Sequence, residues 1–207
     1  MQQQEIGAWL DELASAAPAP GGGAVAALQV ALAAGLVEMV TNLTVGNPRY
    51  AEHEPTMIDA RSRAGAVRQT AVQLVAEDAT AFTAVTDAYK LPRATDEDKA
   101  ARTAAIQQAL LGAADVPVRT ARAASTVVDL AERILPGANV NVLSDVAIAA
   151  SSARAGLEGA IVNIEINRVA IKDEAEKARL GDAIAASERD LDRADAVVAT
   201  VRKGLAR

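Results

Sequence analysis

The segment PAPGGGAVAALQVALAAG, residues 18–35, decides the fold of this chain. Its two prolines end any preceding helix, because proline lacks a backbone N–H and restricts the residue before it to extended geometry. The glycines Gly21, Gly22 and Gly23 leave the backbone open at the start of a helix, whose free N–H groups suit an anion. In the rest of the segment Gln29 is the only polar side chain. A helix walled by Ala and Gly packs closely against its neighbours, so we expect it at the centre of the protein.

A simple turn before a helix is the commoner meaning of such a glycine cluster, and this alternative stays open. Gly21, Gly23 and Ala26 also match the dinucleotide-binding pattern G-x-G-x-x-A. No β-branched strand precedes them and no strand–helix–strand unit follows, so we reject nucleotide binding. The chain also lacks the Gly-Lys-Ser/Thr of a P-loop.

The sequence favours a soluble, cytoplasmic protein. Residues 21–37 are nearly long enough to cross a membrane. Alanine and glycine are weakly hydrophobic, however, and Glu38 follows, so we expect a buried helix and keep a transmembrane span as the second interpretation. The N-terminal MQQQEIGAWLDEL has neither the basic nor the apolar region of a signal peptide. There is no cysteine, which excludes disulfides and thiol chemistry and suits a reducing compartment.

Composition narrows the possible functions further. The 207 residues predict one domain, 1–207, and the net charge of −6 with scattered basic residues argues against nucleic acid as a partner. His53 is the only histidine, so a Ser–His–Asp triad or a multi-histidine metal site is not expected, and we expect His53 to be a solvated loop residue. Aromatic residues are 2% against 51% hydrophobic residues overall, so the core must consist of Ala, Val, Leu and Ile, which suits close-packed helices.

Hydrophobic residues recur at helical spacing throughout, and no segment alternates as a strand would. Thr95 and Asp98 form the pattern of a capping box, and Pro117 predicts a kink inside the helix that follows. The fold class predicted is all-α, a multihelical antiparallel up-and-down bundle of long helices joined by short turns. The expected helices cover about 6–13, 22–45, 55–89, 95–135, 144–171 and 173–205.

In helices this apolar, the informative residues are polar ones that break the pattern. Asp78 lies in an apolar stretch of its helix, where a solvated side chain is the plain alternative to a functional one. Asn163 and Asn167 are four residues apart and share a helix face, so they could contact a ligand or form a hydrogen-bonded pair between helices. Asp145 and Asn163 are 18 residues apart, or roughly 27 Å on one straight helix. Either the substrate is long, or two subunits contribute, or one of these residues is structural.

Six motifs in order give a resemblance to a known family. They are PAPGGGAVAAL, EDATAF, LPR, RTAAIQQALLGAADVPV, NVNVLSD, and NIEIN with Asp173. Together they resemble the cyclodeaminase/cyclohydrolase family of folate enzymes, which includes the C-terminal domain of formiminotransferase-cyclodeaminase and stand-alone methenyltetrahydrofolate cyclohydrolases. The resemblance implies a multihelical fold, a homodimer, a tetrahydrofolate substrate with or without a polyglutamate tail, and no metal or redox cofactor.

The chain departs from the family pattern at four places. Ala24 stands where serine is frequent, and Ala76 where an aspartate is frequent. Arg93 replaces the lysine of Leu-Pro-Lys, which keeps the charge but changes the donor geometry. Ala138 with Asn139 replaces a Gly-Asn pair.

The resemblance also implies roles for particular residues. Asp78 matches the family's aspartate and is the expected catalytic acid/base. Asn163 and Asn167 would bind the pterin or the folate amide, and the amides of Gly21, Gly22 and Gly23, or Arg93, would meet a carboxylate of the glutamate tail. Asn139 and Asp145, from the NVNVLSD motif, complete the expected substrate-binding set.

The activity expected is hydrolysis of 5,10-methenyltetrahydrofolate to 10-formyltetrahydrofolate. We expect the helical domain to account for all 207 residues, and on that expectation no attached transferase domain hands over a formimino intermediate. The alternatives are a formiminotetrahydrofolate cyclodeaminase, which releases ammonia and gives 5,10-methenyltetrahydrofolate, and a non-catalytic folate-binding dimer, as Ala76 would suggest.

Overall fold

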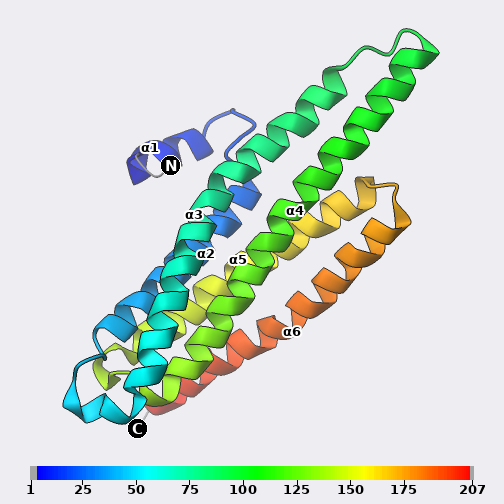
Figure 1. Ribbon diagram of the computed structural model, residues 1–207. Coiled ribbons are helices and arrows are strands. Elements are labelled where there is room, and N and C mark those ends of the chain that lie inside the picture. The colour runs from blue at the N-terminus through cyan, green and yellow to red at the C-terminus, as the bar shows by residue number, and fades with distance from the viewer. Residues whose placement is uncertain (1–3, 206–207) are drawn as a thin grey trace.

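The computed structural model describes residues 4–205; residues 1–3 and 206–207 of the expected domain lie outside this range. Figure 1 shows long helices joined by short turns, and residues 4–205 contain no β-strand, which confirms the all-α prediction. The α-helices are α1 (Ile6–Leu13), α2 (Gly22–Asn42), α3 (Glu54–Lys90), α4 (Asp96–Ile134), α5 (Leu143–Ala170) and α6 (Glu174–Leu205). The 3-10 turns are η1 (Pro48–His53), η2 (Leu135–Gly137) and η3 (Val140–Val142).

The helix boundaries follow the local signals closely. The capping box is present at the start of α4, where Thr95 Oγ1 accepts from Asp98 N–H and an Asp98 carboxylate oxygen accepts from Thr95 N–H, both at 3.0 Å. Pro117, where the sequence predicts a kink, is buried inside α4, and the helix continues on both sides of it. The helix α2 ends at Asn42, short of the predicted 45, because the chain turns there toward η1.

The helices α2, α3, α4 and α5 form an up-and-down bundle in which each contacts the next and α5 closes onto α2. The helix α6 covers the side formed by α4 and α5. The antiparallel register of α2 and α3 is visible where Gly35 faces Arg68 and Gly65 faces Glu38. The α3–α4 hairpin is longer than its neighbours and projects past the α5–α6 turn (Figure 1).

The small-residue helix α2 packs closely against α3, α5 and α4, but it is one of the four bundle helices and not their centre, because its side with Leu32 and Met39 is exposed. A Cβ on Gly156 of α5 would lie 2.7 Å from Val30 Cγ2 and 2.8 Å from the carbonyl oxygen of Ala26, so the two helices touch backbone to backbone. Within residues 4–205, α2 is the one helix long and apolar enough to cross a membrane, with a mean hydropathy of 1.8 over its most apolar stretch. Because α3, α4 and α5 pack around it, the structure favours the buried core helix. Its buried residues include Ala24, Ala26, Ala27, Val30, Ala33, Ala34, Val37 and Val40.

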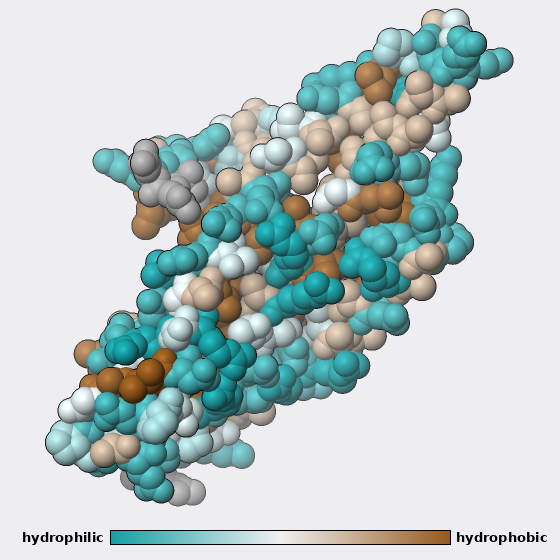
Figure 2. Space-filling model, viewed as in Figure 1, coloured by the Kyte–Doolittle hydropathy of each residue, from teal (hydrophilic) through white to brown (hydrophobic). Residues whose placement is uncertain are grey.

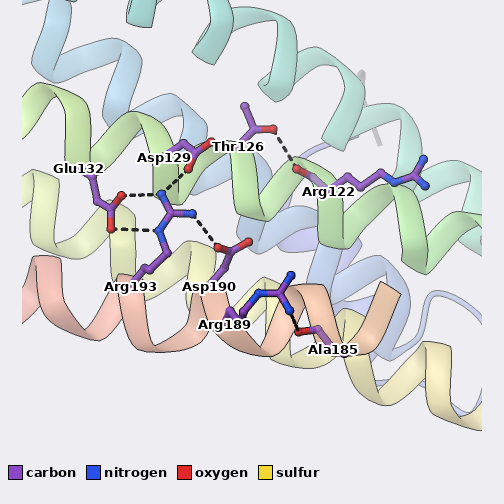
Figure 3. A network of polar contacts seen from close by, with 8 residues as sticks. All are labelled: Arg122, Thr126, Asp129, Glu132, Ala185, Arg189, Asp190 and Arg193. Carbon is purple, nitrogen blue, oxygen red and sulfur yellow. Dashed lines mark hydrogen bonds and ion pairs between the residues drawn. The ribbon is translucent and has the colours of Figure 1, made fainter. Parts of the chain in front are cut away.

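An ion-pair network fastens α6 to α4 (Figure 3). The guanidinium group of Arg193 donates to Glu132 at 2.5 Å, to Asp190 at 2.7 Å, and to Asp129. Its hydrogen bonds to Glu132, Asp129 and Asp190 raise the pKa of Arg193 well above its usual range. Figure 2 shows the face on which α3, α4 and α6 are seen, where hydrophilic residues predominate.

Candidate functional site

Asp78 lies at the N-terminal end of α2, against the glycine cluster. A Cβ placed on Gly23 would be 2.1 Å from Asp78 Oδ1 and 2.6 Å from its Cγ, so the carboxyl group lies directly on the Gly23 backbone. The same carboxyl group accepts a hydrogen bond from the backbone N–H of Ala24. Asp78 thus acts as a cap for α2, whose own N-cap residue, Gly21, has no side chain to do so.

The surroundings of Asp78 shift its acidity in the direction that a general base requires. Burial raises the pKa of the Asp78 carboxyl above its ordinary value, because the charged form loses hydration. The hydrogen bond from Ala24 N–H opposes this shift by stabilising the carboxylate. Because its pKa is raised, Asp78 is a stronger base than an ordinary aspartate.

This arrangement disfavours the expected role of the glycine amides. Gly21, Gly22 and Gly23 do lie at a helix N-terminus, where free N–H groups attract anions. Asp78, however, already occupies the Ala24 N–H, and its charge would repel a glutamate carboxylate brought to the same place. The electrostatics favour a cationic group of the substrate here instead.

Asn163 and Asn167 reach the same end of the bundle from α5. Gly156 packs on Val30 and Gly159 packs on Ala26, so the antiparallel register places Asn163 one turn further, level with the start of α2. Asn163 Nδ2 donates to Gly159 O at 2.8 Å, and Asn167 Nδ2 donates to Asn163 O at 2.9 Å. These bonds stay within α5, unlike the interhelical pair considered as an alternative, and they leave both side-chain oxygens as potential acceptors.

Arg93 lies apart from Asp78 within one chain. It is exposed in the turn between α3 and α4, past the end of the hairpin. The continuous helix from Asp78 to Lys90 alone rises roughly 18 Å. Arg93 therefore contacts the same substrate as Asp78 only if the substrate is long or a second subunit supplies one of the two.

Asn139 and Asp145 lie at the opposite end of α2. Asn139 N–H donates to Thr44 Oγ1 at 3.1 Å, and its Nδ2 donates to Leu43 O at 3.0 Å, so this residue ties η3 to the chain that follows α2. Asp145 lies in the first turn of α5. The structure thus separates the predicted set into one group around Asp78 and Asn163 and a second group around Asn139 and Asp145, with Arg93 distant from both.

His53 lies at the same end of the bundle as Asn139 and Asp145. It is half-buried against Gly137, where an added Cβ would lie 2.2 Å from His53 Cγ, so the expectation of a solvated loop residue is wrong. The side chain fills space between η1 and η2. It lies roughly the length of α2 away from Asp78, too far for joint catalysis.

The sequence reasoning missed the ion pair between Glu77 and Arg119, which joins α3 to α4. Arg119 Nη1 lies 2.5 Å from Glu77 Oε2, and Asp115 lies 3.8 Å from the same nitrogen. These residues and Ala76 line a groove of about 510 Å³ between the two helices. The departure at Ala76 therefore faces this groove, on another side of α3 from Asp78. Glu77 is the first residue of the EDATAF motif and breaks the apolar pattern of its helix, so the sequence does draw attention to it. Nothing in the sequence pointed to Arg119 as its partner.

Two other features bear on what the protein can bind. Within residues 4–205, no group of three or more His, Asp or Glu side chains is arranged to hold a metal ion. A groove of about 580 Å³ runs between α4 and α6, lined by Arg122, Arg179 and Ser187 among others, and Asp78 does not line it.

Comparisons with known proteins agree with this picture. The family model of formiminotransferase-cyclodeaminase matches residues 5–186. A methenyltetrahydrofolate cyclohydrolase of Methylorubrum extorquens is 45% identical over 172 residues, which cover 83% of each chain. The formimidoyltransferase-cyclodeaminase of Rattus norvegicus is 35% identical over 160 residues, and the match spans only 30% of that longer protein. The crystal structure of formiminotetrahydrofolate cyclodeaminase from Thermotoga maritima superposes with a TM-score of 0.88 at 27% identity, covering 100% of this chain and 99% of the other. The resemblance inferred from the six motifs is confirmed, and the chain belongs to the formiminotransferase-cyclodeaminase family.

Proposed function

We propose that this protein is a methenyltetrahydrofolate cyclohydrolase, which hydrolyses 5,10-methenyltetrahydrofolate to 10-formyltetrahydrofolate. The observation that carries the proposal is the half-buried carboxyl group of Asp78, held on the first turn of α2 with a raised pKa. The similarity to the cyclohydrolase of Methylorubrum extorquens over most of both chains supports this choice of reaction.

The chemistry follows from the charge of the substrate. Its reacting carbon bridges N5 and N10 as an amidinium cation, which an ionised carboxylate attracts. Asp78 takes a proton from the attacking water as the new C–O bond forms, which gives a neutral tetrahedral carbon. The bond from this carbon to N5 then breaks, Asp78 returns the proton to N5, and the hydroxyl proton is released to solvent as the formyl group forms on N10. One water is consumed and one proton released, without any redox step.

The asparagines of α5 suit the neutral part of the substrate. The pterin edge presents an N–H and an amino group, which are donors, and the side-chain oxygens of Asn163 and Asn167 are acceptors. Both side chains are half-buried, so a hydrogen bond there is shielded from competing water.

We also propose that the protein works as a homodimer that buries one face of the α2–α5 pair. On each helix, exposed apolar side chains form a stripe beside the contact with the other helix. Viewed from the N-terminus of its own helix, each stripe is displaced in the same rotational sense from the residues that face the other helix. Because α2 and α5 are antiparallel, the two stripes therefore lie on the same side of the pair. A continuous exposed apolar surface marks an interaction site. This α2–α5 apolar face consists of Leu32, Met39, Leu43, Ile148, Val162, Ile166 and Val169.

A twofold dimer across this face would join the two separated groups of expected site residues. If the axis is perpendicular to the helices, the Asn139 and Asp145 end of one chain lies beside the Asp78 and Asn163 end of its partner. The split seen within one chain then has a simple explanation, since each site would draw on both subunits.

An absorbance assay distinguishes a cyclohydrolase from a cyclodeaminase, and calorimetry identifies a protein that binds folate without turnover. Purified protein is given each folate separately, and the absorbance of methenyltetrahydrofolate is followed. A cyclohydrolase makes the absorbance fall faster than the buffer control, and Asp78→Asn abolishes the acceleration. The fold similarity to the Thermotoga maritima cyclodeaminase favours the second candidate, for which formiminotetrahydrofolate would give a rise in absorbance and release of ammonia. Folate binding by calorimetry without turnover of either substrate would identify a non-catalytic binding protein and overturn the proposal.

A further inference from the structure

The three glycines that open α2 are not equivalent. A Cβ added to Gly21 or to Gly22 would meet no atom within 4 Å. A Cβ added to Gly23 would overlap the whole carboxyl group of Asp78, at 2.1 Å from Oδ1, 2.6 Å from Cγ and 2.9 Å from Oδ2. Only at the third glycine, therefore, does the lack of a side chain create space that another residue fills.

The requirement at Gly23 is steric. Among the described residues, Gly46 is the glycine with a positive φ, so alanine could adopt the backbone geometry of Gly23 without strain. Alanine is also the better helix former. Nothing in the local conformation thus explains glycine at this position, whereas the contact with Asp78 does.

Close packing of both helices limits how far their backbones can shift to relieve such an overlap. The helix α2 is in backbone contact with α5, where an added Cβ on Gly156 would be 2.8 Å from Ala26 O. Asp78 is in the middle of the long helix α3, which packs along α2. A methyl group at residue 23 would therefore displace the Asp78 carboxyl group, the only part free to rotate, and separate it from Ala24 N–H.

We propose that Gly23 is a positioning residue, which acts by leaving the space in which the Asp78 carboxyl group lies on the first turn of α2 and faces the substrate. This inference rests on the proposed function, because it assumes that Asp78 takes the proton from water. It assigns Gly23 a role distinct from that of an amide donor to the substrate.

The test compares Gly23→Ala with Gly35→Ala. Gly35 is in the same helix, and its added Cβ would make an ordinary contact 3.6 Å from Arg68 Cδ. We expect Gly23→Ala to lower kcat for methenyltetrahydrofolate on the order of 10²-fold, the scale of a lost general base, with a much smaller change in KM. The ascending limb of its kcat/KM–pH profile should move to lower pH, because the displaced carboxyl group regains hydration. Gly35→Ala should keep the wild-type kcat, KM and profile.

A double-mutant cycle with Asp78→Ala shows whether Gly23 acts through Asp78. In the Asp78→Ala background the overlap is gone, so Gly23→Ala should leave the residual kcat unchanged and should not lower Tm. A kcat of Gly23→Ala equal to that of Gly35→Ala, or a loss that persists in full in the Asp78→Ala background, overturns the inference. If Gly23→Ala fails to fold, recovery of the fold in the double variant supports the contact, and failure of both overturns it.

The same cycle distinguishes the inference from the proposed function. If the wild-type protein turns over neither folate, the proposed function fails and the kinetic role of Gly23 fails with it. The Tm values of the four proteins still decide whether residue 23 and Asp78 compete for one space.

Discussion

Asp145 and Asn163 lie on one uninterrupted helix, α5, close to its two ends. Their separation of 18 residues corresponds to roughly 27 Å, so one chain cannot bring both to the same reacting carbon. Of the three explanations that the sequence left open, a site shared between two subunits agrees best with the exposed α2–α5 apolar face, which runs along the same helix.

The dimer interface can be tested by placing a charge within the α2–α5 apolar face. We expect Ile166→Glu to give a monomer near 21.3 kDa by light scattering, because an unpaired carboxylate would be buried in the contact. Ile58→Glu, at an exposed position on α3 outside this face, should keep the mass of the wild-type dimer. A wild-type protein that is already monomeric at micromolar concentration would exclude the dimer.

The catalytic role of Asp78 predicts that Asp78→Asn loses turnover but not folding. The amide has nearly the shape of the carboxyl group and no useful basicity, so we expect kcat to fall on the order of 10²–10⁴-fold. Circular dichroism and calorimetric binding of a folate should stay close to wild type. Near-normal turnover would assign Asp78 a structural role as the cap of α2.

The raised pKa of Asp78 also predicts a pH dependence of stability. Because the folded pKa lies above that of the unfolded chain, about 3.9, the folded state binds the proton more tightly. The stability that this proton contributes is complete below the unfolded pKa and is lost as pH rises through the folded pKa. We therefore expect the Tm of wild type, relative to Asp78→Asn, to be highest near pH 4 and to fall as pH rises toward 7. A difference in Tm that is constant over this range would contradict the shift.

The network around Arg193 predicts a measurable loss of stability when its centre is removed. Arg193→Met leaves Asp129, Glu132 and Asp190 without their shared cation, and we expect unfolding free energy to fall by about 1–2 kcal/mol. The side chains are partly exposed, so a larger loss is not expected. Arg189→Met is the matched control, because among residues 4–205 the partner of the Arg189 guanidinium group is Ala185 O of its own helix (Figure 3). Equal urea midpoints for the two variants would show that the network adds nothing.

If Arg93 contacts the glutamate tail of the substrate, its removal should weaken binding and leave the chemistry intact. We expect Arg93→Ala to raise KM for a polyglutamylated folate with little change in kcat, since the lost contact is made equally in the ground and transition states. The measurement compares KM for monoglutamyl and polyglutamyl substrates. An unchanged KM for both would remove Arg93 from the site.

Much of the fold was determined by the sequence alone, because the signals are local. The capping pair Thr95 and Asp98 fixed the start of α4, and the prolines and glycines before residue 24 fixed the start of α2. The composition of α2, in which Ala and Gly are frequent, predicted its close packing, since only small side chains permit the close approach of Gly156 to Val30. The motifs were sufficient to identify the family.

The site was decided by tertiary structure. Asp78 is adjacent to Gly23, and Arg119 to Glu77, because packing sets how far each helix slides and turns against the next. Helical periodicity says which face of a helix is buried but not which residue of another helix it meets. A slide of one turn would keep every buried face and yet place a different side chain on Gly23. The register that selects Asp78 depends on the summed fit of the whole core, which no single stretch of sequence contains.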